Sequence, residues 1–250
     1  MKLALLSDLH ANAPALQACL AHAEGQGATQ WAVLGDLVGY GPHPSEVVEV
    51  CRRLEQAGAA VLRGNHEMMA VTPPAQVVRQ GEATARWTHE QLRQDQRQWL
   101  AGLPLTAQCG PVLMVHASAE APEQWRYVED ERSALLSLQA AQQHPGVRYV
   151  VGGHVHHQTL YYQGQGGRLM RFQPVPGVPI PVPTHRHWIA TIGSVGQPRD
   201  GDPRAAYALL DLDRHLLSFF RVRYDHGAVA QAVRAAGLDE ALARRLESGR

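Results

Sequence analysis

The stretch KLALLSDLH, residues 2–10, runs from a short apolar segment directly into two residues that can bind a metal ion, Asp8 and His10. Lys2 to Leu6 is bounded by turn-forming residues, which predicts a buried strand. The pattern from Pro14 to Ala23 predicts a helix after the intervening loop. The chain therefore begins with a strand, a polar loop and a helix.

Strands and helices continue to alternate after this first unit. Further strands are predicted at 31–34, 59–62, 112–115 and 149–151, and further helices after Ser45, at 84–100 and at 133–142. The later part of the chain predicts a hairpin of 159–162 with 169–172 across a Gly-rich turn, a strand at 188–192, a hairpin of 207–212 with 216–222, and a helix at 228–246 broken at Gly237. This order predicts an α/β sandwich in which one sheet is mostly parallel and the other mostly antiparallel.

The composition predicts a single domain that spans residues 1–250. Hydrophobic residues make up 45% of the chain and charged residues 18%, and no Gly/Ser linker divides it. Twenty-three basic residues balance 23 acidic ones, which argues against nucleic acid or an anionic membrane as a partner. No apolar run approaches the roughly 20 residues that span a bilayer, and no cleavage-site pattern follows Leu6. We therefore expect a soluble, cytoplasmic protein.

Each of the first five predicted strands is followed by residues that bind metals. In chain order these are Asp8 and His10, Asp36, Asn65 and His66, His116, and His154 and His156. Ligands of open α/β sheets bind at the carboxyl ends of the strands, so these side chains are expected to meet. A lone Asp or His after a strand is more often structural, but a buried cluster of them is costly without an ion. The ordered set therefore predicts metal binding.

The predicted ligands combine four imidazoles, two carboxylates and one amide oxygen, which suits Mn, Fe, Zn or Co. They are His10, His116, His154, His156, Asp8, Asp36 and Asn65. Seven donors exceed what one ion needs, so two ions bridged by one carboxylate is the economical arrangement. Two adjacent ions would activate a bridging hydroxide and clamp a phosphoryl group, which predicts phosphoester hydrolysis. His66, beside a predicted ligand, can exchange a proton near neutral pH and is our first choice for the general acid.

Five short motifs occur in order at these positions: Asp8-Leu9-His10, Gly35-Asp36, Gly64-Asn65-His66-Glu67, Val115-His116 and Gly153-His154-Val155-His156. Together they closely resemble the calcineurin-like metallophosphoesterase family, and Gly193 to Arg199 resembles its small bacterial branch. The resemblance implies a four-layer αββα sandwich, in which two mixed β-sheets are flanked by helices. It implies that Asp8, His10 and His156 hold one ion. The other ion would be held by Asn65, His116 and His154, with Asp36 as the bridge and His66 as the general acid.

Several further residues bear on substrate binding. Gly39-Tyr40-Gly41 stands where eukaryotic-type protein phosphatases carry Asp-Arg-Gly, and Tyr40 is expected either to stack on a substrate base or to pack its loop. Arg63 matches the arginine of their Arg-Gly-Asn-His-Glu motif, so the resemblance implies a bidentate phosphate anchor. Asn12 is predicted to contact phosphate along with Asn65, with capping of the following helix as the alternative for Asn12. For Arg199 the two alternatives are a contact with phosphate and an exposed position in its loop.

We predict a hydrolase of phosphomonoesters, phosphodiesters or nucleotide polyphosphates, with a small phosphorylated substrate favoured over a phosphoprotein. The small bacterial branch that the chain resembles implies diadenosine polyphosphatases or protein phosphatases. Two divalent ions are the expected cofactors, manganese first, with iron, zinc, cobalt or nickel as alternatives. The alternative function is a metal-binding scaffold without turnover, which has no need of an acid such as His66. The five prolines from Pro174 to Pro183 predict an extended edge loop, and no oligomeric state is predicted.

Overall fold

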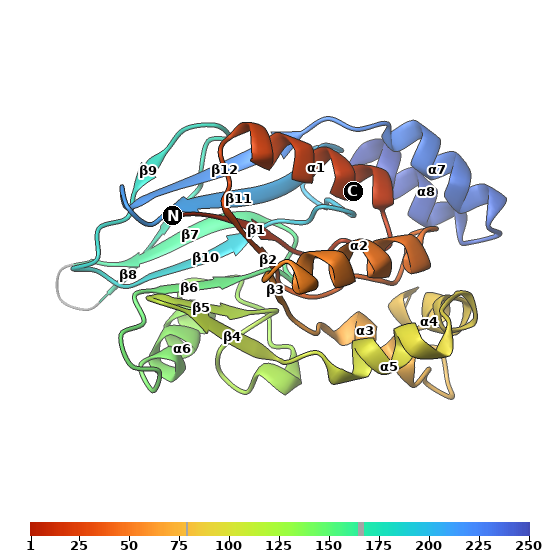
Figure 1. Ribbon diagram of the computed structural model, residues 1–250, viewed down its shortest axis with the longest axis horizontal. Helices are drawn as coiled ribbons and strands as arrows, with labels where there is room; N and C mark the ends of the chain where they lie inside the picture. Colours follow the sequence, from red (N-terminus) through yellow and green to blue (C-terminus); the bar gives the residue numbers. More distant parts are fainter. Residues whose placement is uncertain (79, 165–167) are drawn as a thin grey trace.

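Two six-stranded β-sheets pack against each other in the computed structural model, which describes residues 1–78, 80–164 and 168–250 (Figure 1). The first sheet has the order β3 (Ala60–Val61), β2 (Gln30–Val33), β1 (Lys2–Leu6), β11 (Ala205–Asp211), β12 (Leu216–Val222) and β9 (Ile180–Pro181). The second has the order β4 (Thr106–Cys109), β5 (Val112–Val115), β6 (Tyr149–Gly152), β10 (Trp188–Ile192), β7 (Gln158–Gln163) and β8 (Leu169–Phe172).

Helices cover the outer faces of both sheets, which confirms the predicted four-layer αββα sandwich (Figure 1). The first sheet is covered by α1 (Ala13–Gly25) and α2 (Pro44–Gln56), and the second by α6 (Glu131–Ala141). At one end of the sandwich lie α3 (Asn65–Val71), α4 (Gln80–Gln91) and α5 (Gln94–Gly102), and the C-terminal hairpin of α7 (His226–Ala235) and α8 (Glu240–Ser248). Within the described ranges, no helix combines the length and the apolar character needed to cross a membrane.

The apolar residues of β1 are divided between two cores because successive side chains of a strand point to opposite faces. Leu3 and Leu5 pack between the two sheets, whereas Ala4 and Leu6 pack toward α1 and α2. A third core lies between the second sheet and α6, where Leu138 is buried. Each fully buried leucine contributes roughly 2 kcal/mol from the removal of its surface from water. This burial on both faces explains why residues 2–6 are apolar without alternation.

Both sheets are mixed, so the expectation of one mostly parallel and one mostly antiparallel sheet is wrong. In the first sheet β1 pairs in parallel with β2 and antiparallel with β11. In the second, β6 pairs in parallel with both β5 and β10, while β10 pairs antiparallel with β7. The reason is that the late hairpin β11–β12 extends the first sheet instead of joining the second. The carboxyl ends of parallel strands from both sheets can therefore contribute to one site.

Two local predictions also need correction. The single helix predicted at 84–100 is two helices, because Arg93 adopts an extended conformation and its N–H donates to the side chain of Gln96, which starts α5. The edge strand β4 was not predicted, although Ala107 and Cys109 alternate with polar residues and pack against the core between the sheets. The predicted hairpin of β7 and β8 is confirmed, but residues 165–167 of its Gly-rich turn lie outside the described residues. The proline-rich segment contributes β9, which pairs with β12 at the edge of the first sheet.

Candidate metal centre

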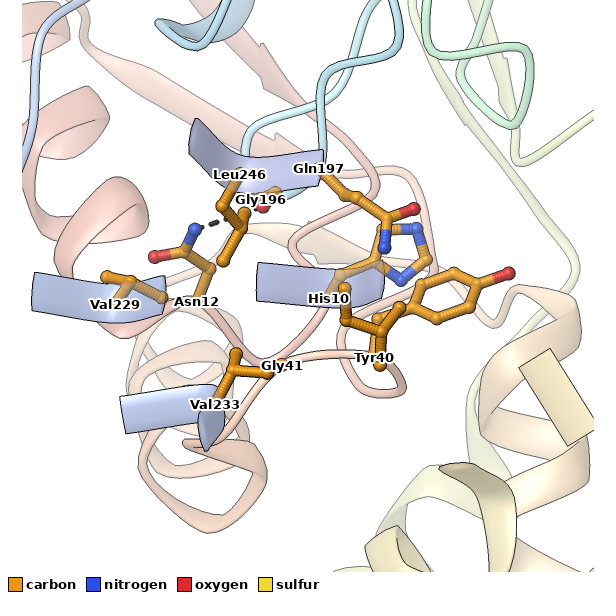
Figure 2. A pocket seen from close by; sticks show the side chains of 10 residues that line it. His10, Asn12, Tyr40, Gly41, Gly196, Gln197, Val229, Val233 and Leu246 are labelled. Carbon is orange, nitrogen blue, oxygen red and sulfur yellow. Dashed lines mark hydrogen bonds between the residues drawn. The ribbon is translucent and has the colours of Figure 1, made fainter. Parts of the chain in front are cut away.

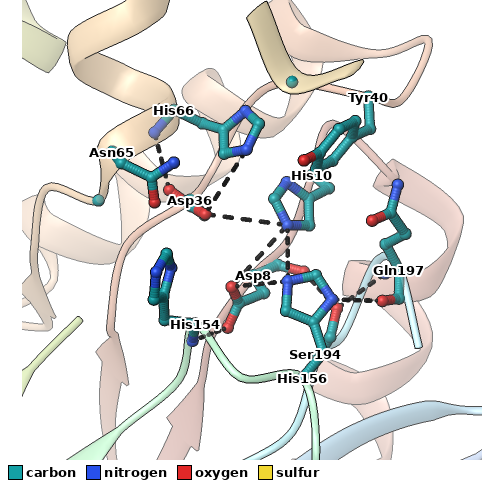
Figure 3. Close-up of polar contacts among 12 residues, drawn as sticks. Asp8, His10, Asp36, Tyr40, Asn65, His66, His154, His156, Ser194 and Gln197 are labelled. Carbon is teal, nitrogen blue, oxygen red and sulfur yellow. Dashed lines mark hydrogen bonds and ion pairs between the residues drawn. The ribbon is translucent and has the colours of Figure 1, made fainter. Parts of the chain in front are cut away.

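The predicted ligands meet at the carboxyl ends of strands from both sheets, and Figure 3 shows how those other than His116 converge. Asp8 and His10 follow β1, Asp36 follows β2, Asn65 follows β3, His116 follows β5, and His154 and His156 follow β6. Five of them, Asp8, His10, Asp36, His154 and His156, have positive φ angles between 44° and 64°. Non-glycine residues rarely adopt such angles, at a cost of order 1 kcal/mol each, and they concentrate at functional sites. The loops are therefore shaped to turn these side chains inward.

Each of the two carboxylates uses one oxygen to hold the backbone and turns the other toward the cluster. Asp8 Oδ2 accepts from the N–H of His154 at 2.9 Å, and Asp36 Oδ1 accepts from the N–H of His66 at 2.9 Å. Asp8 Oδ1 is buried and has no hydrogen-bond partner among the described residues, although it lies 3.1 Å from His156 Nε2. A buried, unpartnered carboxylate oxygen is costly. A cation at this position would remove that cost.

One group of ligands consists of Asp8, His10 and His156, whose ligand atoms lie within 4.8 Å of one another. His10 Nδ1 lies 3.2 Å from the carbonyl oxygen of Val38, and His156 Nδ1 contacts the carbonyl oxygen of Gln197. When Nδ1 of a neutral imidazole donates a hydrogen bond, Nε2 has no proton and presents a lone pair. The two Nε2 atoms lie only 3.1 Å apart. Two lone pairs and a carboxylate oxygen repel one another unless they share a cation, so these residues fit a metal ion.

A second group consists of Asp36, His116 and His154. His116 Nε2 lies 3.3 Å from Asp36 Oδ2, 3.1 Å from His154 Nδ1 and 3.3 Å from Asn65 Oδ1. Its Nδ1 lies 2.8 Å from the carbonyl oxygen of Leu34, which orients the ring. Asp36 Oδ2 is also 3.9 Å from His10 Nε2 in the first group. This oxygen therefore lies between the two groups.

Electrostatics keep most of the cluster in the protonation states that metal binding needs. Burial alone would raise the carboxyl pKa values, but His156 beside Asp8 and His116 beside Asp36 hold both pKa values well below the usual range. Burial, reinforced by the charge of His116, lowers the pKa of His154 to about 3. His116 differs: burial opposes its charge, yet the Asp36 carboxylate raises its pKa to about 9. A bound cation would displace that proton, since metal ligands must be deprotonated.

His66 lies at the side of the cluster that faces Tyr40. Its Nε2 is 4.0 Å from Asp36 Oδ2, and His10, Asp36 and His66 form a third group of ligand atoms within 4.8 Å. Burial lowers its pKa, while the Asp36 carboxylate acts in the opposite direction. The structure thus brings His66 to the cluster of predicted ligands, and its role as an acid stays a prediction.

Two predicted phosphate contacts have other partners in the structure. The side chain of Asn12 accepts from Ala15 N–H as the cap of α1, and its amide group donates to Gly196 O and Tyr224 Oη. The capping alternative is therefore present in the structure, and the phosphate contact of Asn12 stays a prediction. Arg63 donates to the carbonyl oxygen of Ala101 at the end of α5. Its Nε is buried without a hydrogen-bond partner among the described residues, and its role as a phosphate anchor stays a prediction.

Glu67 is a structural residue of the site to which the sequence assigned no role. Its carboxylate is fully buried and accepts four backbone N–H groups, from Asp36, Leu37, Val38 and Gly64. Burial and the nearby Asp36 carboxylate raise the pKa of Glu67 to about 7, while the backbone N–H groups act in the opposite direction. An acidic residue at the start of α3, directly after His66, was the available signal. Glu67 fixes the loop after β2 to the loop after β3.

The segment after β10 closes the site from the other side of the sandwich. Ser194 Oγ donates to the carbonyl oxygen of Asp8 and accepts the N–H of Gln197, and the carbonyl oxygen of Gln197 orients His156. Val195 and Gly196 donate to the carbonyl oxygens of Ser7 and Asp8. The motif Gly193 to Arg199 was the sequence signal, but its partner could not be identified without the fold.

Tyr40 packs between the cluster and the C-terminal helices. Its ring centre lies 4.7 Å from that of His10 and 4.5 Å from that of His66. Figure 2 shows a small cavity behind it, bordered by Asn12, by Gln197 and by apolar side chains of α7 and α8 such as Val233. Gly39 has a φ of 84°, and a Cβ there would lie 2.2 Å from His66 Nδ1. Gly39 thus allows the loop to contact His66 directly, and Tyr40 has the packing role of its two alternatives.

Comparison with known proteins shows consistent similarity over the whole chain. Residues 1–215 match the model of the calcineurin-like phosphoesterase superfamily domain. The crystal structure of a metallophosphoesterase from Sphaerobacter thermophilus is 33% identical with a TM-score of 0.85, and both chains are covered completely. An uncharacterised protein of Methanocaldococcus jannaschii is 28% identical over 99% of this chain and 98% of its own. A hypothetical protein from Pyrococcus horikoshii shares the fold, with 20% identity, a TM-score of 0.79, and coverage of 100% of this chain and 98% of its own.

Proposed function

The chain belongs to the calcineurin-like phosphoesterase superfamily, and on that premise we propose that it is a phosphoric ester hydrolase that uses two divalent metal ions. The observation that carries this proposal is the position of Asp36 Oδ2 between the two groups of ligands, 3.9 Å from His10 Nε2 and 3.3 Å from His116 Nε2. One shared carboxylate between two groups is the arrangement expected of a dinuclear site. We assign Asp8, His10 and His156 to one ion and Asn65, His116 and His154 to the other.

The two ions, when bound, would polarise the phosphoryl group and lower the pKa of water toward neutrality. The protein residues supply orientation and proton transfer. Val38, Gln197 and Leu34 hold three imidazoles through their backbone carbonyls, so the ligand nitrogens keep fixed directions. His66 is free of such a carbonyl bond among the described contacts and stands beside Asp36. We assign it the transfer of a proton to the leaving oxygen of the ester.

The substrate that we propose is a small phosphorylated molecule, and manganese is the ion to test first. The donor set of imidazole, carboxylate and amide oxygen supports manganese, iron, zinc or cobalt, with nickel as a further alternative. The position of His66 beside the buried cluster favours an enzyme over a metal-binding scaffold, because a scaffold needs no imidazole at this position.

The test is hydrolysis of p-nitrophenyl phosphate and bis-p-nitrophenyl phosphate by metal-stripped protein to which Mn, Fe, Zn, Co, Ni or Mg is restored. Asp36→Asn should lower kcat/KM by roughly 1,000-fold, because the ions contribute several kcal/mol and about 1.4 kcal/mol corresponds to a factor of ten. Asp213→Asn is the matched control, since Asp213 is 77% exposed and lies beyond Asp211, which pairs with the amino end of β1.

Metal-dependent turnover that is retained by Asp213→Asn and lost by Asp36→Asn would establish the hydrolase, and the preferred ester would separate monoesterase from diesterase activity. A protein that binds two ions and hydrolyses neither ester, together with a stable partner in pull-down experiments, would favour the scaffold function instead.

A further inference from the structure

A cleft of about 330 Å³ lies next to the proposed metal centre. It is lined by Val155 and His157, which flank the ligand His156 in the chain, and by Tyr127. The ring of Tyr127 stacks on that of the ligand His154, with centres 4.2 Å apart and planes 22° apart. This volume lies at the lower end of the range for small-molecule sites. A substrate held at the metal centre therefore has an adjoining space for the group attached to its phosphate.

The charge of the cleft favours an anion. Arg171 and Arg199 line it, and Glu129 is the only acidic residue among its lining residues. No ion pair is recorded for either arginine within the described ranges. Guanidinium groups match phosphate and carboxylate oxygens well, so these two side chains can bind an anionic group in the cleft.

Arg199 is held in place at the boundary between the cleft and the cluster. Its Nε and Nη2 donate to Gln197 Oε1 at 3.3 Å and 2.9 Å, and the backbone carbonyl of the same Gln197 orients His156. Its guanidinium carbon lies 5.7 Å from the ring centre of Tyr40, which packs on His10 and His66. The side chain thus has a fixed position relative to the metal ligands, as a specificity residue requires.

Tyr161 supplies an independent observation. Its side chain is fully buried and lines the cleft, and its hydroxyl group has no hydrogen-bond partner in the part of the chain that the structure describes. Tyr161 is paired with Arg171 across β7 and β8, and opposite residues of an antiparallel pair lie on the same face of the sheet. A buried hydroxyl without a partner costs about 1–3 kcal/mol. A ligand oxygen between Tyr161 and Arg171 would satisfy both side chains.

We propose that this cleft binds the leaving group of the substrate, and that it selects phosphoesters whose leaving group carries a second anionic group, recognised by Arg171, Arg199 and the hydroxyl of Tyr161. The inference rests on the proposed function, since it takes the adjoining cluster as the site of the first phosphate. It assigns to the chain a substrate class, phosphoesters with a phosphate or carboxylate on the leaving group.

Three phosphonates of equal chain length test this inference by calorimetric titration of the manganese-loaded protein. Propane-1,3-diphosphonate and 3-phosphonopropionate carry a second anionic group, and propylphosphonate carries none. All three resist hydrolysis because a P–C bond replaces the ester bond. We expect one of the two probes with a second anionic group to bind about 10- to 100-fold more tightly than propylphosphonate. Which of them gains most distinguishes a second phosphate from a carboxylate.

Arg171→Gln and Arg199→Gln should each remove most of this advantage, measured in each variant as the ratio of the dissociation constant of propylphosphonate to that of the favoured probe. Tyr161→Phe should lower this ratio by about three- to tenfold, which a hydroxyl without a ligand would not do. Arg214→Gln is the control, because Arg214 is an exposed arginine beyond Asp211, at the opposite end of β1 from the cluster.

Equal binding of the three phosphonates, or an advantage that survives both arginine substitutions, would overturn the leaving-group assignment and leave the proposed hydrolase intact. If none of the three binds, the proposed phosphoester site itself fails, and the inference fails with it.

Discussion

The two halves of the metal cluster differ in how they are enclosed. Asp8, His10 and His156, which we call the enclosed half, are at most 2% exposed, and they are covered by Tyr40 and by the segment after β10. Asn65, His116 and His154, which we call the open half, are less enclosed. Asn65 is partly exposed, and His154 is 7% exposed and is covered by Tyr127, which is itself 49% exposed.

The two halves also differ in how firmly the protein backbone orients their imidazole rings. Both imidazoles of the enclosed half have an Nδ1 next to a backbone carbonyl, whereas in the open half only His116 has this support and His154 turns its Nδ1 toward the cluster. Fixed partners raise metal affinity by about 10- to 100-fold. If the protein binds two ions as proposed, we expect the ion of the enclosed half to be retained and the ion of the open half to exchange and to meet the substrate beside the cleft.

The largest effect is expected for Glu67→Gln, which should abolish the difference between the halves. Glu67 binds the N–H of Val38, whose carbonyl orients His10, and the N–H of Gly64, next to Asn65. An amide in its place would turn donors toward backbone donors. We expect a loss of about 3 kcal/mol in the free energy of unfolding by urea, with loss of both ions. Glu123→Gln, at an exposed position, should change neither quantity, and a stable Glu67→Gln protein with full metal content would contradict the role given to Glu67.

Replacement of one histidine in each half sharpens the comparison. His156→Ala should weaken retention of the tighter ion by more than about 100-fold, since a lost ligand costs more than a lost supporting hydrogen bond. His154→Ala should leave that ion bound and weaken only the second. Elemental analysis of metal content after graded dialysis measures both. The same loss in the two variants would show that the halves are equivalent.

A smaller effect is expected for Ser194→Ala, which leaves every ligand in place. The Ser194 hydroxyl connects Asp8 to Gln197, and Gln197 orients His156. We expect about 30-fold weaker binding of the tighter ion, with the second ion affected less. Manganese titration read by electron paramagnetic resonance would give both constants. Ser248→Ala, which removes a hydroxyl bound within α8, serves as control, and an unchanged tight constant would exclude this support.

The smallest effect is expected for Gly39→Ala, which should alter catalysis and not metal content. The added Cβ would lie 2.2 Å from His66 Nδ1, so the imidazole must shift. We expect kcat for bis-p-nitrophenyl phosphate to fall about tenfold, because small displacements of a catalytic group are costly. Gly177→Ala has a similar φ of 80° and open space around its Cβ, and it separates backbone strain from the contact with His66. Unchanged turnover would argue against His66 as the proton donor.

The sequence was most informative where a predicted strand is followed directly by a predicted metal ligand. Asp8, His10 and Asp36 follow apolar strands directly, so both the strand and the polar ligand were visible in a few consecutive residues. The alternation of strands and helices and the family motifs then predicted the αββα layers. The order of ligands along the chain also predicted which strands end at the site.

Features that depend on contacts between distant residues could not be predicted. Whether the β11–β12 hairpin extends the first or the second sheet depends on its pairing with β1, and nothing local distinguishes the two. The partners of Asn12 and Arg63 are Gly196 and Ala101, far along the chain. Arg199 was weighed between a phosphate contact and an exposed loop position because the cleft that it lines includes residues from β7 and β8. The fold was therefore predictable in its layers, and the site in its ligands more than in its surroundings.

The pairing of the first strand with β11 also has a consequence for biosynthesis. Lys2 pairs with Asp211, and Ser7 and Asp8 receive their hydrogen bonds from Val195 and Gly196. At about 5–20 residues per second, a ribosome delivers these partners roughly 10 to 40 s after it delivers β1. During that interval one edge of an apolar strand lacks its neighbour, which is a hazard for aggregation. Gln197, whose carbonyl oxygen orients His156, also emerges late, so under the proposed function the site of the tighter ion is completed only near the end of translation.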